Sequence, residues 1–311
     1  MSRSNSTIGI IGAGALGGLF GGYLSKSGNN VAFVDKNAEL VKTINEEGLT
    51  IERPGEEEFT VFPIATTTPA DIDPVDLLFV FVKAIHTEQA IQEATPMLDD
   101  DTAVVTVQNG LRNVDIISGH VPAERVVGGT TTMGSSLGAL GNVLHTGKGE
   151  TKIGGDDDAA VTRTAETLMQ AGIETSTVDN PRPHIWDKQL ISVAIKPTAA
   201  LTELLDGPLA ERSETAWVME KLVEEAVEVA EARGIDTLAD DPVEAVEEVC
   251  AVNYDTMSSM LEDVLNERTT EIDHINGAIV DYAEQEGIEA PYNRMVTNLV
   301  KGKEYSYDDS S

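Results

Sequence analysis

A glycine-rich turn near the N-terminus constrains the fold of this chain more than any other feature. The turn follows the apolar run 7–11 and precedes a helical pattern, and a second apolar run, 30–34, ends on Asp35. This order of strand, glycine turn, helix, strand and acid is the context in which G-x-G-x-x-G predicts dinucleotide binding. We therefore expect the turn to cradle a pyrophosphate at a helix N-terminus, and Asp35 to accept hydrogen bonds from a ribose. The turn residues predicted to contact the cofactor are Gly12, Ala13, Gly14, Ala15, Leu16 and Gly17.

The first half of the chain alternates strand-like and helix-like segments. The runs 75–82 and 103–107 are apolar throughout, as in parallel strands that are buried on both faces. Beyond a polar, proline-bearing breaker at 179–183, the pattern is helical almost to the end. We predict a doubly wound α/β domain of the Rossmann type at 1–179 and an all-α substrate domain at 180–311. The cofactor crevice should open at the carboxyl ends of the strands, toward the helical domain.

Charge sets the chain apart, since 54 acidic against 21 basic residues give a formal net charge of −33. A surface of this kind repels nucleic acid and anionic membranes, and it destabilises the compact state at low salt. The acids are spread over the chain, and no run has EF-hand spacing, so we expect a solvated shell suited to the cytosol of a halophile and no metal site.

Cys250 is the single cysteine, which excludes an intrachain disulfide. The N-terminal residues are polar and lack the apolar core of a signal peptide, and no apolar run is long enough to span a bilayer. We expect a cytoplasmic protein. Oligomeric state stays open, because apolar helix stripes in the second half suit either internal packing or a homodimer.

Polar residues with chemical potential stand at strand ends and in the helical half. Lys83 ends the first buried strand, and Asn109 follows the second. Lys188 opens the helical half, and Ser259 and Glu271 come later. Taken singly, each has a structural explanation: a solvated lysine, a turn asparagine, or an acid near a helix start.

Taken together, the motifs resemble the ketopantoate reductase (2-dehydropantoate 2-reductase) family over nearly the whole chain. In that family the lysine of Trp-x-Lys is the general acid, which implies this role for Lys188. The resemblance also implies that Glu271, with Ser259 beside it, holds the hydroxyl end of the substrate, and that Asn109 and Lys83 line the crevice. The motifs that carry it are the glycine turn, Val82–Ala84, Gln108–Gly110, Gly128–Thr132, His145–Gly149 before Ile153-Gly154, Trp186–Lys188, Pro197–Leu201, Ser258–Leu261 and Thr270–Gly277.

The chain departs from the bacterial pattern where that pattern has asparagines on the substrate wall. Four and eight residues after Lys188 stand Ser192 and Lys196, and the later positions correspond to Asp206 and Thr256. Ser192 still donates a hydrogen bond, and Lys196 adds a positive charge suited to the carboxylate of a keto acid.

The resemblance implies NAD(P)H-dependent reduction of 2-dehydropantoate (ketopantoate) to pantoate, in the route to pantothenate and coenzyme A. Asp35 favours NADH, because a carboxylate repels a 2′-phosphate, whereas Lys36 suits NADPH. Because the asparagines of the bacterial pattern are replaced in this chain, an alternative stays open: a reductase or dehydrogenase of another small 2-keto or hydroxy acid. A third hypothesis is a non-catalytic NAD-binding regulator, against which Lys188 and Glu271 together argue.

Overall fold

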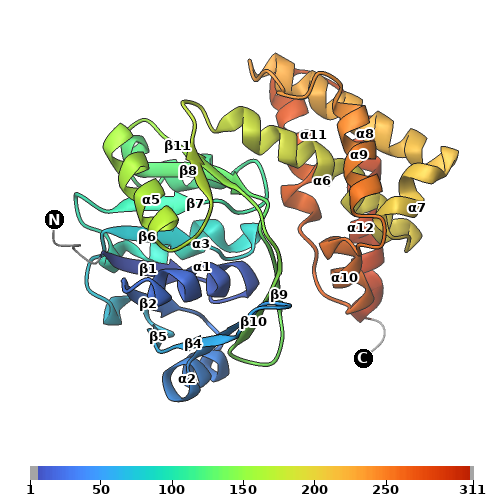
Figure 1. The fold of residues 1–311 in the computed structure, drawn as a ribbon. Helices are drawn as coiled ribbons and strands as arrows, with labels where there is room; N and C mark the ends of the chain where they lie inside the picture. The colour runs from blue at the N-terminus through green and yellow to red at the C-terminus, as the bar shows by residue number, and fades with distance from the viewer. Residues whose placement is uncertain (1–5, 309–311) are drawn as a thin grey trace. The chain divides into compact units, whose positions relative to one another are not determined.

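The computed structural model describes residues 6–308, which form two compact units (Figure 1). The first unit comprises the chain up to Gln108 together with Asn113–Pro181, and the second comprises Asn109–Arg112 together with the chain from Arg182 onward. A doubly wound sheet followed by a helical unit confirms the predicted fold class.

An eight-stranded sheet forms the centre of the first unit, in the order β12-β11-β8-β7-β6-β1-β2-β5. Neighbouring strands are parallel except for the antiparallel pair of β8 and β11. The strands are β1 (Thr7–Ile11), β2 (Asn30–Val34), β5 (Ile64–Thr66), β6 (Leu77–Val80), β7 (Ala103–Thr106), β8 (Val126–Thr131), β11 (Thr151–Gly154) and β12 (Thr175–Thr177).

Helices cover both faces of this sheet, so the central strands are buried on both sides. Leu77 and Phe79 of β6 belong to one apolar cluster, which α1 and α5 complete, whereas Leu78 and Val80 belong to a second cluster with α3 and α4. This alternation follows from the two-residue period of a strand, and it explains why the sequence of β6 is apolar throughout. The helices of this unit are α1 (Ala15–Lys26), α2 (Ala38–Glu47), α3 (Thr87–Glu93), α4 (Asn113–Ser118) and α5 (Asp158–Gln170).

A second, four-stranded sheet packs on α1, in the order β4-β3-β10-β9. The sequence suggested only an irregular, partly strand-like stretch up to residue 64, because β3 pairs with the distant β10. Two glycines of α1 allow the close approach: a Cβ on Gly18 would lie 2.8 Å from Val143, and one on Gly22 would lie 2.6 Å from Ile51. The strands of this sheet are β3 (Leu49–Glu52), β4 (Phe59–Val61), β9 (Gly134–Leu137) and β10 (Asn142–Gly147).

The second unit is helical, with the 21-residue α6 in contact with α7 to α10 and with α12. The sequence predicts the start of α9, and the Asp241 side chain indeed accepts hydrogen bonds from two first-turn amides ahead of Pro242. The sequence also predicts a last helix that starts at Ala290-Pro291 and carries Met295 and Leu299; α12 is present, and both side chains are about half exposed. The helices are α6 (Arg182–Thr202), α7 (Asp206–Glu211), α8 (Ser213–Ala232), α9 (Pro242–Val252), α10 (Ser259–Leu265), the 3₁₀ turn η5 (Ile272–His274), α11 (Asn276–Glu286) and α12 (Pro291–Asp308).

A buried polar network compensates for the proline inside α6. Pro197 has no N–H, which leaves the carbonyl of Val193 without its helical donor. The side chain of Asn276 donates to that carbonyl at 2.9 Å and to Asn293 at 3.0 Å. Asn293 in turn donates to Glu225 at 2.8 Å, so α6, α8, α11 and α12 share one network behind the second half of α6.

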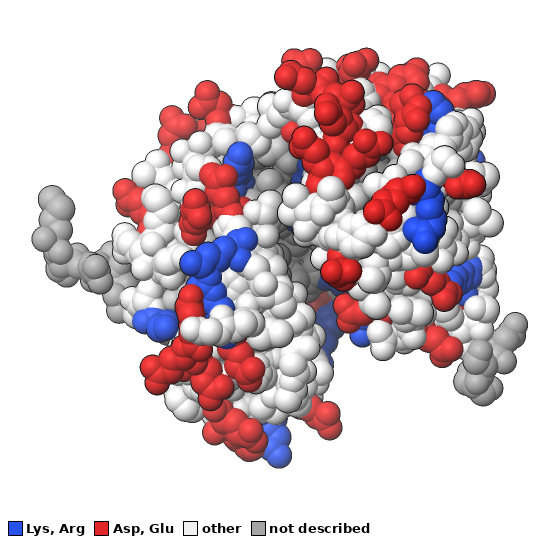
Figure 2. Space-filling model, turned by 45° about the vertical axis from the view of Figure 1, so that its right-hand side comes forward, with Lys and Arg blue, Asp and Glu red and all other residues white. Residues whose placement is uncertain are grey.

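Acidic side chains cover much of the surface that Figure 2 shows, with lysines and arginines set singly or in small groups among them. At low ionic strength these carboxylates repel one another, and salt screens that repulsion. Among residues 6–308, no helix is long and apolar enough to cross a membrane.

We expect the midpoint of thermal unfolding to rise by roughly 10 °C or more between about 0.1 M and about 2 M KCl. The measurement is a set of melting curves over that range. A midpoint that does not change with KCl would show that the net charge of −33 places no salt requirement on this fold.

Candidate active site

Each glycine of the turn meets a distinct steric demand. Gly12 has a φ of +95°, which disfavours a side chain, and its amide donates to the Val34 carbonyl at 2.9 Å. A Cβ on Gly17 would lie 1.9 Å from the carbonyl oxygen of Gly12, so the helix and the turn touch there. Gly14, in contrast, has open space beside it, with no heavy atom within 4 Å of a Cβ. The arrangement suits a phosphate that approaches Gly14, because α1 begins there and no side chain caps it.

Asp35 is bound to the turn itself. One carboxylate oxygen accepts from the amide of Ala13 at 2.7 Å, and the other accepts from the amide of Asn37 at 2.9 Å. The sequence did not reveal the first of these bonds, which joins residues 22 positions apart. Each oxygen keeps acceptor capacity for a ribose hydroxyl. The Lys36 side chain is 66% exposed, and its ammonium lies 3.7 Å from Glu93.

Gln108 connects the ends of β6 and β7, near which Lys83 and Asn109 lie. Gln108 has no role in the predictions made from the sequence. Strand β6 ends at Val80, two residues before the predicted end, and Lys83 immediately precedes the 3₁₀ turn Ala84–His86. The Gln108 amide donates to the carbonyl of Val82 and to the hydroxyl of Thr87, and so ties the two strand ends together. Asn109 is the first residue of the segment that belongs to the helical unit.

The predicted general acid and two of the predicted substrate residues lie along one side of α6, four residues apart. Lys188 and Lys196 are half-buried, and Ser192 between them is buried, with its hydroxyl 3.2 Å from the Lys188 carbonyl. Burial lowers the pKa of Lys188 to about 8; the charge of Lys196 acts in the same direction, and Glu271 opposes both. A lysine with a pKa near neutrality can give up and regain a proton.

The segments that follow α9 and α10 supply the remaining polar groups. Glu271 immediately precedes η5. Hydrogen bonds of the two adjacent residues fix the backbone on either side of it. The Thr270 amide donates to Glu304 at 2.8 Å, and the Ile272 amide donates to the Thr270 hydroxyl. Ser258 caps α10 through its hydroxyl, which leaves Ser259 exposed at the first position of that helix.

Comparison with known proteins identifies the family. Residues 8–157 match the family described as "Ketopantoate reductase PanE/ApbA", and residues 180–304 match "Ketopantoate reductase PanE/ApbA C terminal". The chain belongs to the ketopantoate reductase family. It is therefore an oxidoreductase, as the motifs predicted.

The relatives cover nearly the whole chain. The 2-dehydropantoate 2-reductase of Halobacterium salinarum is 34% identical over 295 residues, which is 94% of this chain and 97% of that protein. The one from Pyrococcus abyssi is 33% identical over 298 residues, 95% of this chain and 97% of that protein. Among solved structures, a PanE/ApbA family ketopantoate reductase from Ralstonia eutropha has a TM-score of 0.91 at 29% identity, over 97% of this chain and 99% of that one.

A second solved structure similar to this chain is that of D-mandelate dehydrogenase with NADH and anilino(oxo)acetate. It has a TM-score of 0.91 at 30% identity, and covers 97% of this chain and 99% of that one. Together with the glycine turn, the family supports a nicotinamide cofactor. The fold is thus shared by enzymes that are named for different substrates, ketopantoate and D-mandelate.

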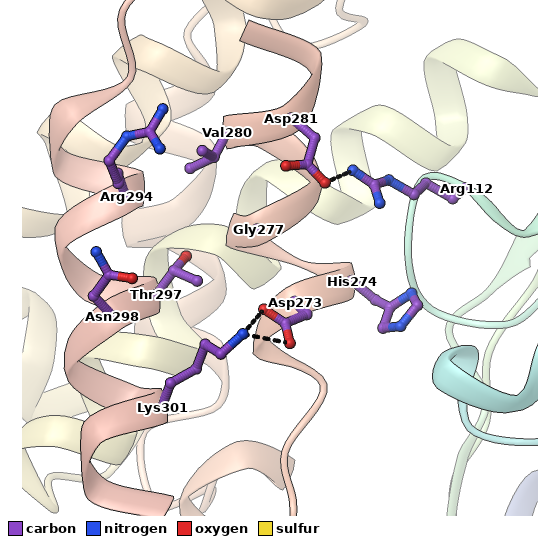
Figure 3. Close-up of a pocket in the computed structure, with 10 residues that line it drawn as sticks. All are labelled: Arg112, Asp273, His274, Gly277, Val280, Asp281, Arg294, Thr297, Asn298 and Lys301. Atoms are coloured by element: carbon purple, nitrogen blue, oxygen red, sulfur yellow. Dashed lines mark hydrogen bonds and ion pairs between the residues drawn. The ribbon is translucent and has the colours of Figure 1, made fainter. Parts of the chain in front are cut away.

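The helical unit of this family member also has a pocket of about 270 Å³ between α11, α12 and η5 (Figure 3). Lys301 pairs with Asp273 at 2.9 Å, and Arg112 pairs with Asp281, so the polar walls are largely neutralised by ion pairs. The lining consists of Arg112, Asp273, His274, Gly277, Val280, Asp281, Arg294, Thr297, Asn298 and Lys301, and includes none of the predicted site residues.

His145, in the His-Thr-Gly segment of the family pattern, has a structural role in the first unit. It is 5% exposed, one ring nitrogen lies 2.8 Å from the Tyr23 hydroxyl, and the other lies 2.9 Å from the Gly147 carbonyl. Burial lowers the pKa of His145, which favours the neutral ring in this bridge between α1 and β10. The sequence predicts a structural rather than a catalytic role for His145 and a core position for Trp186, and their burial confirms both predictions.

Proposed function

We propose that this protein reduces 2-dehydropantoate to pantoate with NAD(P)H, and that Lys188 is the general acid. The observation that carries the proposal is the state of Lys188, a half-buried lysine whose pKa is lowered to about 8 beside Glu271. Full-length relatives named 2-dehydropantoate 2-reductase, one of them from a Halobacterium, support the substrate.

The proposed chemistry needs one proton donor and one anchor. When bound, the reduced nicotinamide supplies the hydride for the 2-keto carbon. Negative charge then develops on the keto oxygen, and the Lys188 ammonium stabilises it and transfers its proton there. The carboxylate of Glu271 accepts a hydrogen bond from the primary alcohol and disfavours a second carboxylate, with Ser259 and Ser192 as further hydrogen-bonding groups. The released amine regains a proton from water.

The first unit supplies all of the cofactor residues in this proposal except Asn109, which belongs to the second unit. The turn Gly12–Gly17 holds the pyrophosphate, Asp35 receives the ribose, and Lys83 and Asn109 extend the cofactor site. Asp35 and Lys36 favour different cofactors. We favour NADH, because Asp35 is bound to the turn whereas Lys36 is exposed and already lies beside Glu93.

A second candidate is reduction of another small 2-keto acid. The similarity to D-mandelate dehydrogenase favours it, as do Lys196 and Asp206 in place of asparagines on the substrate wall. A non-catalytic regulator with the same fold would bind the cofactor without turnover.

The test is oxidation of NADH and of NADPH, side by side in molar KCl, with 2-dehydropantoate and with benzoylformate as the aryl comparison. We expect turnover of 2-dehydropantoate, with the higher kcat/KM for NADH. Preference for benzoylformate would support the second candidate. Cofactor binding with no turnover of either acid, in protein with a cooperative melting curve, would contradict the proposed function.

A further inference from the structure

Lys196 is a second lysine on the reactive side of α6, and the proposed function as described above gives it no step. Eight residues separate it from Lys188, a rise of about 12 Å along the helix. Its side chain is half-buried, and burial lowers its pKa. Among the described residues, Lys196 makes no hydrogen bond and no ion pair. A carboxylate bound directly to Lys196 would cancel most of the electric field of its ammonium. Without such a partner, the charge of Lys196 acts on the titratable groups around it.

Carboxylates from three different elements act electrostatically on Lys196, and none of them is hydrogen-bonded or ion-paired to it. They are Glu271 before η5, Asp263 on α10 and Asp206 at the start of α7, and each favours the charged ammonium. Asp263 is already bound by Arg268 at 2.8 Å. Glu271 acts on Lys188 as well.

Asp206 is the most unusual of these groups, since it is 6% exposed and its Oδ1 has no hydrogen-bond partner. A buried carboxylate oxygen without a donor is costly, and here the charge of Lys196 is the compensating interaction. Burial raises the pKa of Asp206 to about 6, and Lys196 opposes that rise. The other titratable group beside Asp206 is Cys250 on α9, whose pKa burial raises to about 12, so it stays neutral.

We propose that Lys196 is a positioning residue of the reduction: kept charged by Asp206, it shares Glu271 with Lys188 and so promotes transfer of the Lys188 proton to the substrate. This inference rests on the proposed function. A neighbouring cation favours the neutral amine of Lys188, and Glu271 stabilises the Lys188 ammonium less when it also faces a second ammonium. Lys188 is thereby a stronger acid when the keto oxygen begins to gain charge.

The test compares the wild type with Lys196→Met, which removes the charge at similar length, and Lys196→Arg, which keeps it. Lys221→Met is the control, because Lys221 lies on α8, is paired with Glu220 and Glu224, and is not among the groups that shift the pKa of Lys188. Two pH profiles are recorded in molar KCl: kcat/KM for the 2-keto acid, and the rate at which acetic anhydride acetylates Lys188, followed by peptide mass spectrometry.

In both pH profiles, one limb follows the titration of Lys188. We expect Lys196→Met to move this limb to higher pH by about 0.5–1 unit, and we expect Lys196→Arg and Lys221→Met to leave it in place. A limb that stays in place in Lys196→Met while KM rises would overturn the proposal and make Lys196 an anchor for the substrate carboxylate. The acetylation profile reports on Lys188 without turnover, so an unmoved acetylation limb refutes this inference even if the proposed reaction is absent, and a moved limb supports the coupling.

Discussion

Replacement of Lys188 by methionine is expected to lower kcat for 2-dehydropantoate by about 10²–10⁴-fold, the usual contribution of a positioned general acid. Methionine keeps the apolar stem and removes the ammonium, so the variant loses the proton donor and the charge that stabilises the developing alkoxide. The glycine turn, Asp35 and Lys83 lie in the other unit, and the dissociation constant for NADH should therefore stay within about twofold of the wild-type value.

The wild-type pH profile gives the same prediction an independent check. Reduction requires the protonated lysine, so activity should be full well below pH 8 and fall as the pH rises through the lowered pKa of about 8. An unperturbed lysine would keep its proton to about pH 10. Loss of the alkaline limb in residual Lys188→Met activity would link the limb to this residue. A variant that keeps wild-type kcat would remove Lys188 from the proposed chemistry.

Local signals in the sequence predicted the elements that depend on local residues. The strand–turn–helix at Gly12–Gly17 and the Asp241–Pro242 helix start need only neighbouring residues, and both are present. The pairing of β3 with β10 joins segments about ninety residues apart, and no local pattern indicates it. The sequence also predicts a helix over 87–97, but α3 ends at Glu93, because Pro96 cannot continue it and a 3₁₀ turn takes its place.

In the candidate site, too, the sequence predicts which side chains are present but not the surroundings that change their chemistry. Motif order singled out Lys188 and Glu271, but the lowered pKa of Lys188 depends on its burial. Likewise, the bond between Asp35 and the Ala13 amide, and the role of Asn276 at the Val193 carbonyl, are tertiary contacts. Side-chain type is readable along the chain, whereas desolvation and partner geometry arise only when distant segments pack together.

The glycine turn permits a matched pair of substitutions that separates binding from folding. Gly14→Ala should weaken NADH binding by about tenfold or more, because the methyl group projects into the open space that a pyrophosphate would approach. Its free energy of unfolding should change by less than about 1 kcal/mol, since its φ of −68° is accessible to alanine.

Gly17→Ala should instead destabilise the fold by about 1–3 kcal/mol, because its Cβ would lie 1.9 Å from the Gly12 carbonyl oxygen and the helix must shift. Denaturant unfolding without cofactor and NADH titration of the folded protein measure the two effects separately. Weak binding with intact stability in Gly14→Ala, beside lost stability in Gly17→Ala, would assign the phosphate approach to Gly14. If Gly14→Ala bound NADH as tightly as the wild type, the open space beside Gly14 would lie outside the cofactor site.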